Sequence, residues 1–181
     1  MPRLFLLSPA KVDGLRAGLL LNPNAAFPLA RQFRSSGLPL ADIFAFASAL
    51  YFRGKIAYAR RFADPAQGDV IRVITANAGL LPPDKILKPA DLAAFGAVDI
   101  HEDDPRYAKP LRRDAKALER KLGPRGTAIL LGSIATGKYR DVLLEVFDGR
   151  LLFPPDFIGR GDMSRGGMLL RAARDGVELS Y

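Results

Sequence analysis

The chain contains no cysteine and only one histidine among its 181 residues. Without cysteine there can be no disulfide, no thiolate nucleophile and no zinc site built on thiolates. The single histidine, His101, stands in no Ser-His-Asp order, and no nucleophile-elbow pattern is present. Its acidic neighbours up to Asp104 are consecutive, so we expect their side chains to splay apart rather than converge on a metal. The sequence therefore predicts neither a metal nor a cofactor.

Long hydrophobic runs, low-complexity stretches and internal repeats are absent as well. The run from Leu4 to Leu7 is too short for a signal peptide or a membrane span and is followed at once by Pro9. We interpret it as the buried first strand of a cytoplasmic protein that makes no membrane contact. The length fits one domain, covering residues 1–181.

Acidic residues are fewer than basic ones, so the formal net charge is +8 and the isoelectric point is about 10.0. Such a surface attracts polyanions through counterion release, which favours nucleic acid or phosphorylated small molecules as partners. One segment, residues 106–122, is expected to form a helix with a strongly basic face. A generic basic surface that serves only solubility is the alternative.

Short apolar runs alternate with longer amphipathic segments. The runs predict buried strands at residues 3–8, 70–75, 127–131 and 150–153. Helices are expected at residues 25–35, 40–62 (with a break near Gly54), 106–122, 138–147 and 163–174. This order predicts a single-domain α/β fold with a mostly parallel central sheet flanked by helices, and a basic cleft.

Glycine and lysine stand together between the third of these strands and the next helix. Gly132, Gly137 and Lys138 match most of a phosphate-binding loop, in which loop amides and a helix N-terminus hold an anion. Tyr139 occupies the place of the hydroxyl residue that would hold magnesium, which argues against a nucleotide triphosphatase. A plain anion site with Ser133 and Lys138, or a structural glycine turn, remains open.

Two further basic segments are candidates for phosphate contacts. In residues 159–167, Arg160 and Arg165 could hold phosphates while Asp162 faces a substrate, or Asp162 or Ser164 could simply cap the following helix. In residues 51–55, aromatic rings and cations mix as in proteins that bind unstacked bases. We expect the rings to lie in the core and the cations to face solvent or phosphate.

The order of several short motifs resembles that of the YaaA peroxide-stress family. The matching segments are residues 6–11 (LLSPAK), 52–55 (FRGK), 79–83 (GLLPP) with 88–89 (KP), and 160–165 (RGDMSR). The chain differs from the family pattern at Val12, Lys55 and Ala90. The resemblance implies a mixed α/β protein with a positively charged cleft that binds DNA.

These observations lead to one leading prediction and two alternatives. The leading prediction is a nucleic-acid-binding protein that, if it is an enzyme, cleaves an N-glycosidic bond with Asp162, or secondarily Asp141, as the carboxylate. A non-catalytic DNA-binding stress-response protein and an enzyme acting on a small nucleoside or nucleotide are the alternatives. The residues expected to bind phosphate or nucleic acid are Ser8, Lys11, Arg53, Lys55, Ser133, Lys138, Arg160, Ser164 and Arg165.

Overall fold

A computed structural model, which describes residues 1–48 and 50–181, places a five-stranded sheet at the centre of the protein. The strand order is β4-β3-β1-β6-β7, and only the pair β3–β4 is antiparallel. The strands are β1 (Arg3–Leu7), β3 (Ile71–Ile74), β4 (Leu80–Leu81), β6 (Thr127–Leu131) and β7 (Leu151–Leu152). The predicted α/β fold with a mostly parallel sheet is confirmed.

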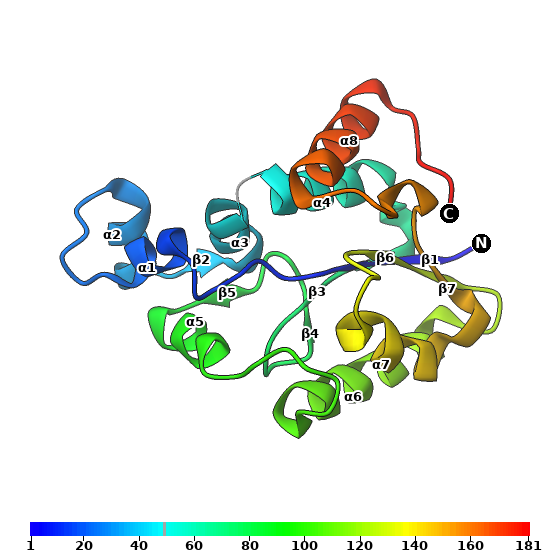
Figure 1. Ribbon diagram of the computed structural model, residues 1–181, viewed down its shortest axis with the longest axis horizontal. Coiled ribbons are helices and arrows are strands. Elements are labelled where there is room, and N and C mark those ends of the chain that lie inside the picture. Colours follow the sequence, from blue (N-terminus) through cyan, green and yellow to red (C-terminus); the bar gives the residue numbers. More distant parts are fainter. Residues whose placement is uncertain (49) are drawn as a thin grey trace.

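Two helix pairs cover the two faces of this sheet (Figure 1). Helices α4 (Leu50–Phe62) and α8 (Asp162–Asp175) pack on one face, and α6 (Pro105–Leu122) and α7 (Gly137–Phe147) on the other. Side chains of β1 alternate accordingly: Phe5 and Leu7 join the core beneath α4 and α8, whereas Leu4 and Leu6 join the core beneath α6 and α7. Burial on both faces explains why the strand is a continuous apolar run.

The remaining elements gather beyond the carboxyl end of β1, on the side away from both chain termini (Figure 1). They are α1 (Leu15–Leu21), α2 (Pro28–Ser35), α3 (Leu40–Ser48), α5 (Pro89–Gly96) and a small antiparallel sheet of β2 (Leu38–Pro39) and β5 (Ile86–Leu87). Three short 3-10 turns, Pro65–Gln67, Asp148–Arg150 and Pro155–Phe157, complete the described chain. Within the described ranges, no helix has the length and apolar character needed to cross a bilayer.

Helices α4 and α8 touch at two glycines. A Cβ atom on Gly54 would lie 2.7 Å from the carbonyl oxygen of Gly166, and a Cβ on Gly166 would lie 2.9 Å from the backbone of Leu50 and Tyr51. The expected helix break at Gly54 is therefore wrong: this glycine lies inside α4 because the partner helix leaves no room for a side chain. The contact brings the residues next to these glycines, Lys55 and Arg165, to the same end of the sheet.

Candidate functional site

The candidate site lies where β1 and β6 end side by side. The backbone amide of Ser8, just after β1, donates to the carbonyl oxygen of Leu131, the last residue of β6, over 3.1 Å. Strand β1 is paired with β3 on one side and with β6 on the other, so the chain reverses its direction of strand addition here. In open α/β sheets this switch point leaves a crevice at the carboxyl ends of the strands.

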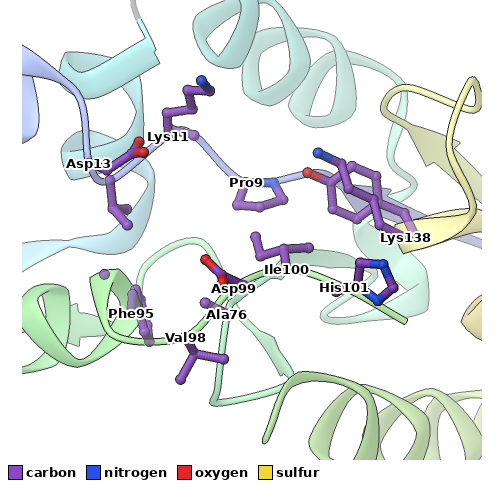
Figure 2. Close-up of a pocket in the computed structure, with 14 residues that line it drawn as sticks. Pro9, Lys11, Asp13, Ala76, Phe95, Val98, Asp99, Ile100, His101 and Lys138 are labelled. Carbon is purple, nitrogen blue, oxygen red and sulfur yellow. The ribbon is translucent and has the colours of Figure 1, made fainter. Parts of the chain in front are cut away.

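A cleft of about 450 Å³ opens at this point. One wall is the segment that follows β1, from Pro9 to Asp13, and the opposite wall runs from Val98 to His101 (Figure 2). Lys138 and Tyr139 from the first turn of α7 close one end. Side chains from the ends of β3 and α5, Ala76 and Phe95, complete the lining.

The cleft combines apolar walls with a few charges. Figure 2 shows Pro9 and Ile100 facing each other, with Lys138 towards one end and Asp13 towards the other. The ammonium of Lys138 lies 5.1 Å from the centre of the Tyr139 ring. Lys11, which also lines the cleft, is exposed. Such a lining suits a small ligand with a flat apolar part and an ionic group.

A buried lysine lies directly behind this cleft. Lys55 is 1% exposed, and its ammonium donates to the carbonyl oxygen of Ser8 at 2.6 Å and to the Ser8 Oγ at 2.8 Å. The same ammonium lies 4.3 Å from the centre of the Tyr51 ring. The expectation that Lys55 faces solvent or phosphate is therefore wrong: within the folded chain it holds the end of β1.

Burial changes the acid–base properties of this cluster. Desolvation lowers the pKa of Lys55 to about 7, against the attraction of the Asp162 carboxylate, which favours the charged amine. Desolvation likewise raises the pKa of Tyr51 to about 12, and it raises the pKa of Tyr139, which Asp162 raises further. Asp162 therefore lies within electrostatic reach of Lys55, of Tyr51 and of the cleft wall at Tyr139.

Arg165 ties the start of α8 to this cluster. Its side chain is largely buried, its Nε donates to the carbonyl oxygen of Phe157 over 3.1 Å, and its guanidinium lies 3.5 Å from the Asp162 carboxylate. Asp162 is itself exposed and is the first residue of α8, after Gly161 at the N-cap, so it does not cap the helix. Among the described residues, the Tyr51 hydroxyl is a buried polar atom without a hydrogen-bond partner.

The glycine-rich loop before α7 has contacts within the chain that account for its glycines. A Cβ on Gly132 would lie 2.8 Å from the Cβ of Ser8. A Cβ on Gly137 would lie 2.1 Å from Asp141 Oδ2 and 3.0 Å from Glu102 Oε1. Two carboxylates thus already stand beside the positive end of α7, which leaves the predicted phosphate loop without support at this helix start.

The other predicted contact residues are more dispersed. Arg53, Arg160 and Ser164 are exposed, and the Nε of Arg160 donates to the carbonyl oxygen of Asp156 over 2.8 Å. Ser133 accepts a long hydrogen bond, 3.4 Å, from the backbone amide of Ala135 in its own loop. Of the predicted residues, only Lys11 and Lys138 line the cleft, while Ser8, Lys55, Arg165 and Asp162 form the cluster behind and beside it.

Sequence reasoning missed part of this arrangement. It gave no role to Asp13 and Asp99, the carboxylates that line the cleft. It placed the ring of Tyr51 in the core, where the structure has it, but did not predict that Tyr51 and Tyr139 join the cluster to the cleft wall. One pattern could have revealed the inward direction of Lys55. It lies four residues after Tyr51 and three before Tyr58, on the apolar stripe of its helix.

Comparison with protein-family models, with curated proteins and with solved structures returns no match to this chain. The YaaA resemblance stays a prediction.

Proposed function

We propose that the cleft binds one nucleotide unit, and that the protein acts on nucleic acid by cleaving an N-glycosidic bond. The observation that carries this proposal is the cleft itself, which combines apolar walls, two lysines and adjacent carboxylates at the switch point of the sheet. The apolar lining between Pro9 and Ile100 would contact the flat base. Lys11 would pair with a phosphate, and so would Lys138 through its side-chain ammonium rather than through the amides at the start of α7.

For hydrolysis of an N-glycosidic bond, the protein has to orient the substrate and water and stabilise the charge that develops on the sugar. The bond from C1′ to the base nitrogen breaks, the base leaves with the electron pair and takes up a proton, and water adds to C1′. A carboxylate stabilises the positive charge that develops on the sugar and orients the water. Asp162 is suited to this role because it is exposed, anchored to Arg165 and electrostatically coupled to the Tyr139 wall.

Asp141 suits the catalytic role less well. Its carboxylate pairs with Arg140 at 2.7 Å and lies against Gly137 at the start of α7. Neither Asp141 nor Asp162 lines the cleft, but only Asp162 acts electrostatically on Tyr139 in its wall. Asp141 therefore provides a matched control, in which the same substitution is made at a carboxylate that pairs with Arg140.

Abasic-site formation tests the proposal. Wild-type protein is incubated with single- and double-stranded DNA that carries damaged or modified bases, and aldehyde-reactive labelling then detects abasic sites. We expect product with the wild type and with Asp141→Asn, and at least a hundredfold less with Asp162→Asn. Equal activity of Asp162→Asn and the wild type would remove Asp162 from the reaction, and Asp13→Asn and Asp99→Asn would then be compared.

A free nucleotide is the second candidate substrate. A cleft of about 450 Å³ accommodates a single nucleotide but not a strand, and this size favours a small-molecule enzyme as the alternative. Release of free base from a nucleoside monophosphate, with no abasic site formed in any DNA, would favour that alternative over a nucleic-acid glycosylase.

A further inference from the structure

Helix α6 presents a row of cations to solvent, on the opposite side of the sheet from α4 and α8 (Figure 1). The row consists of four exposed residues at helical positions i, i+4, i+7 and i+11, which we call the α6 basic row: Lys109, Arg113, Lys116 and Arg120. This spacing places all four side chains on one stripe of the helix. None of them lines the cleft.

The rest of α6 leaves this stripe free of acidic side chains. Buried residues such as Tyr107 and Leu111 face the core on the opposite side of the helix. Glu119 lies to one side of the stripe and pairs with Arg150. Arg113 pairs with Asp114, whose other carboxylate oxygen accepts from the amide of Leu80. In the described ranges the other three members of the row form no ion pair.

We infer that the α6 basic row is a docking surface for the sugar–phosphate backbone of a nucleic acid duplex. Eleven residues of helix span about 16 Å, and phosphates on one strand of a duplex follow each other about every 3.4 Å along the axis. A row of this length therefore lies within reach of several phosphates of a duplex. Side chains on a folded helix hold their charges at fixed spacings, which suits the regular charge of a duplex.

A membrane surface is a poorer partner for this row. A helix that binds at a membrane interface turns its apolar face to the lipid, but the apolar face of α6 is already buried against the sheet and α7. The inference shares with the proposed function only the choice of nucleic acid as the polyanion. It adds a second surface, remote from the cleft, that holds duplex flanking a target nucleotide.

The salt dependence of DNA binding tests the inference. Anisotropy titrations of a labelled 20-base-pair duplex of random sequence are run from 50 to 200 mM NaCl with the wild type and with two quadruple variants of equal charge. The row variant carries Lys109→Gln, Arg113→Gln, Lys116→Gln and Arg120→Gln. The control variant carries Arg16→Gln, Arg60→Gln, Lys85→Gln and Arg171→Gln, at exposed positions outside α6.

The slope of log K against log salt is negative. Removal of four phosphate contacts should make it less steep by about 3.6, because each contact contributes about 0.9 to its magnitude. We expect this loss, and at least a tenfold weaker affinity at 100 mM NaCl, in the row variant but not in the control variant, with both variants folded by circular dichroism. Equal losses in the two variants, or a row variant that binds as the wild type does, would overturn the inference. So would wild-type protein that binds anionic vesicles but not the duplex. Mononucleotide binding to the row variant is measured in parallel and should be unchanged, so failure of the cleft proposal is recognised separately.

Discussion

Replacement of Lys55 by methionine should abolish a pH dependence of stability that the buried amine imposes. Methionine keeps most of the side-chain volume and cannot titrate. In the folded protein burial lowers the pKa of Lys55 to about 7, from 10.5 for a free lysine. Below pH 7 both the folded and the unfolded chain carry the proton, and the full cost of burying the charge opposes folding. Between pH 7 and 10.5 only the unfolded chain keeps it, so stability rises with pH.

The size of this effect follows from the two pKa values. One pKa unit corresponds to about 1.4 kcal/mol, and because the folded amine is half-protonated at pH 7, the expected gain in the free energy of unfolding from pH 7 to pH 9 is about 2 kcal/mol. Tyr51 does not titrate in this window, because burial raises its pKa to about 12. The difference between wild type and variant isolates the lysine from other groups.

Urea unfolding followed by far-UV circular dichroism at pH 7, 8 and 9 provides the assay. The stability of wild type minus that of Lys55→Met should rise by about 2 kcal/mol across this range, with unchanged m-values. Lys116→Met, at an exposed position of α6, is the matched control and should show the same pH dependence as the wild type. If the difference in the free energy of unfolding between wild type and Lys55→Met stayed constant with pH, Lys55 would not be a buried amine with a lowered pKa.

Two pairs of glycine substitutions test the packing that holds the site. Gly166→Ala should destabilise the protein by about 1–3 kcal/mol, because the new methyl group would lie 2.9 Å from the α4 backbone. In Gly167→Ala, the next residue of α8, the new methyl group meets only the flexible end of Arg171, so this variant should be neutral or more stable by up to about 1 kcal/mol. Chemical denaturation measures the stability of both variants. Equal effects of the two substitutions would contradict the close contact between α4 and α8. Gly79→Ala should cost more stability than Gly68→Ala in thermal melts, since both glycines have positive φ but only Gly79 packs against a carboxylate and backbone of α6. A smaller loss at Gly79 than at Gly68 would exclude that contact.

The sequence could predict the parts of the fold that depend on local pattern. Residues 127–131 form β6 as predicted, because an apolar run of this length is buried on both faces. Helix α6 begins after Asp104, whose carboxylate accepts from the amide of Arg106, and aspartate is a residue type typical of this capping position. The two-residue strands β2, β4 and β5 were missed, whereas β7, of the same length, lies within the predicted strand at residues 150–153.

The candidate site was less predictable because it depends on contacts between distant segments. Gly54 looked like a helix breaker, and only the approach of Gly166 explains its place inside α4. Lys55 looked like a surface cation beside Arg53, yet the acceptors at Ser8, at the end of β1, draw its ammonium inward. The sequence of one segment shows where charged side chains stand, but not which of them the fold buries.

The central claim is that the cleft beyond β1 and β6 binds a nucleotide. Amide chemical shifts of labelled protein, recorded by NMR during titration with the four deoxynucleoside monophosphates, test it most directly. At least one nucleotide should give saturable shifts, concentrated in residues 9–13, 95–101 and 138–139. Shifts that do not saturate for any nucleotide, or that fall only on α6 and other outer helices, would contradict it.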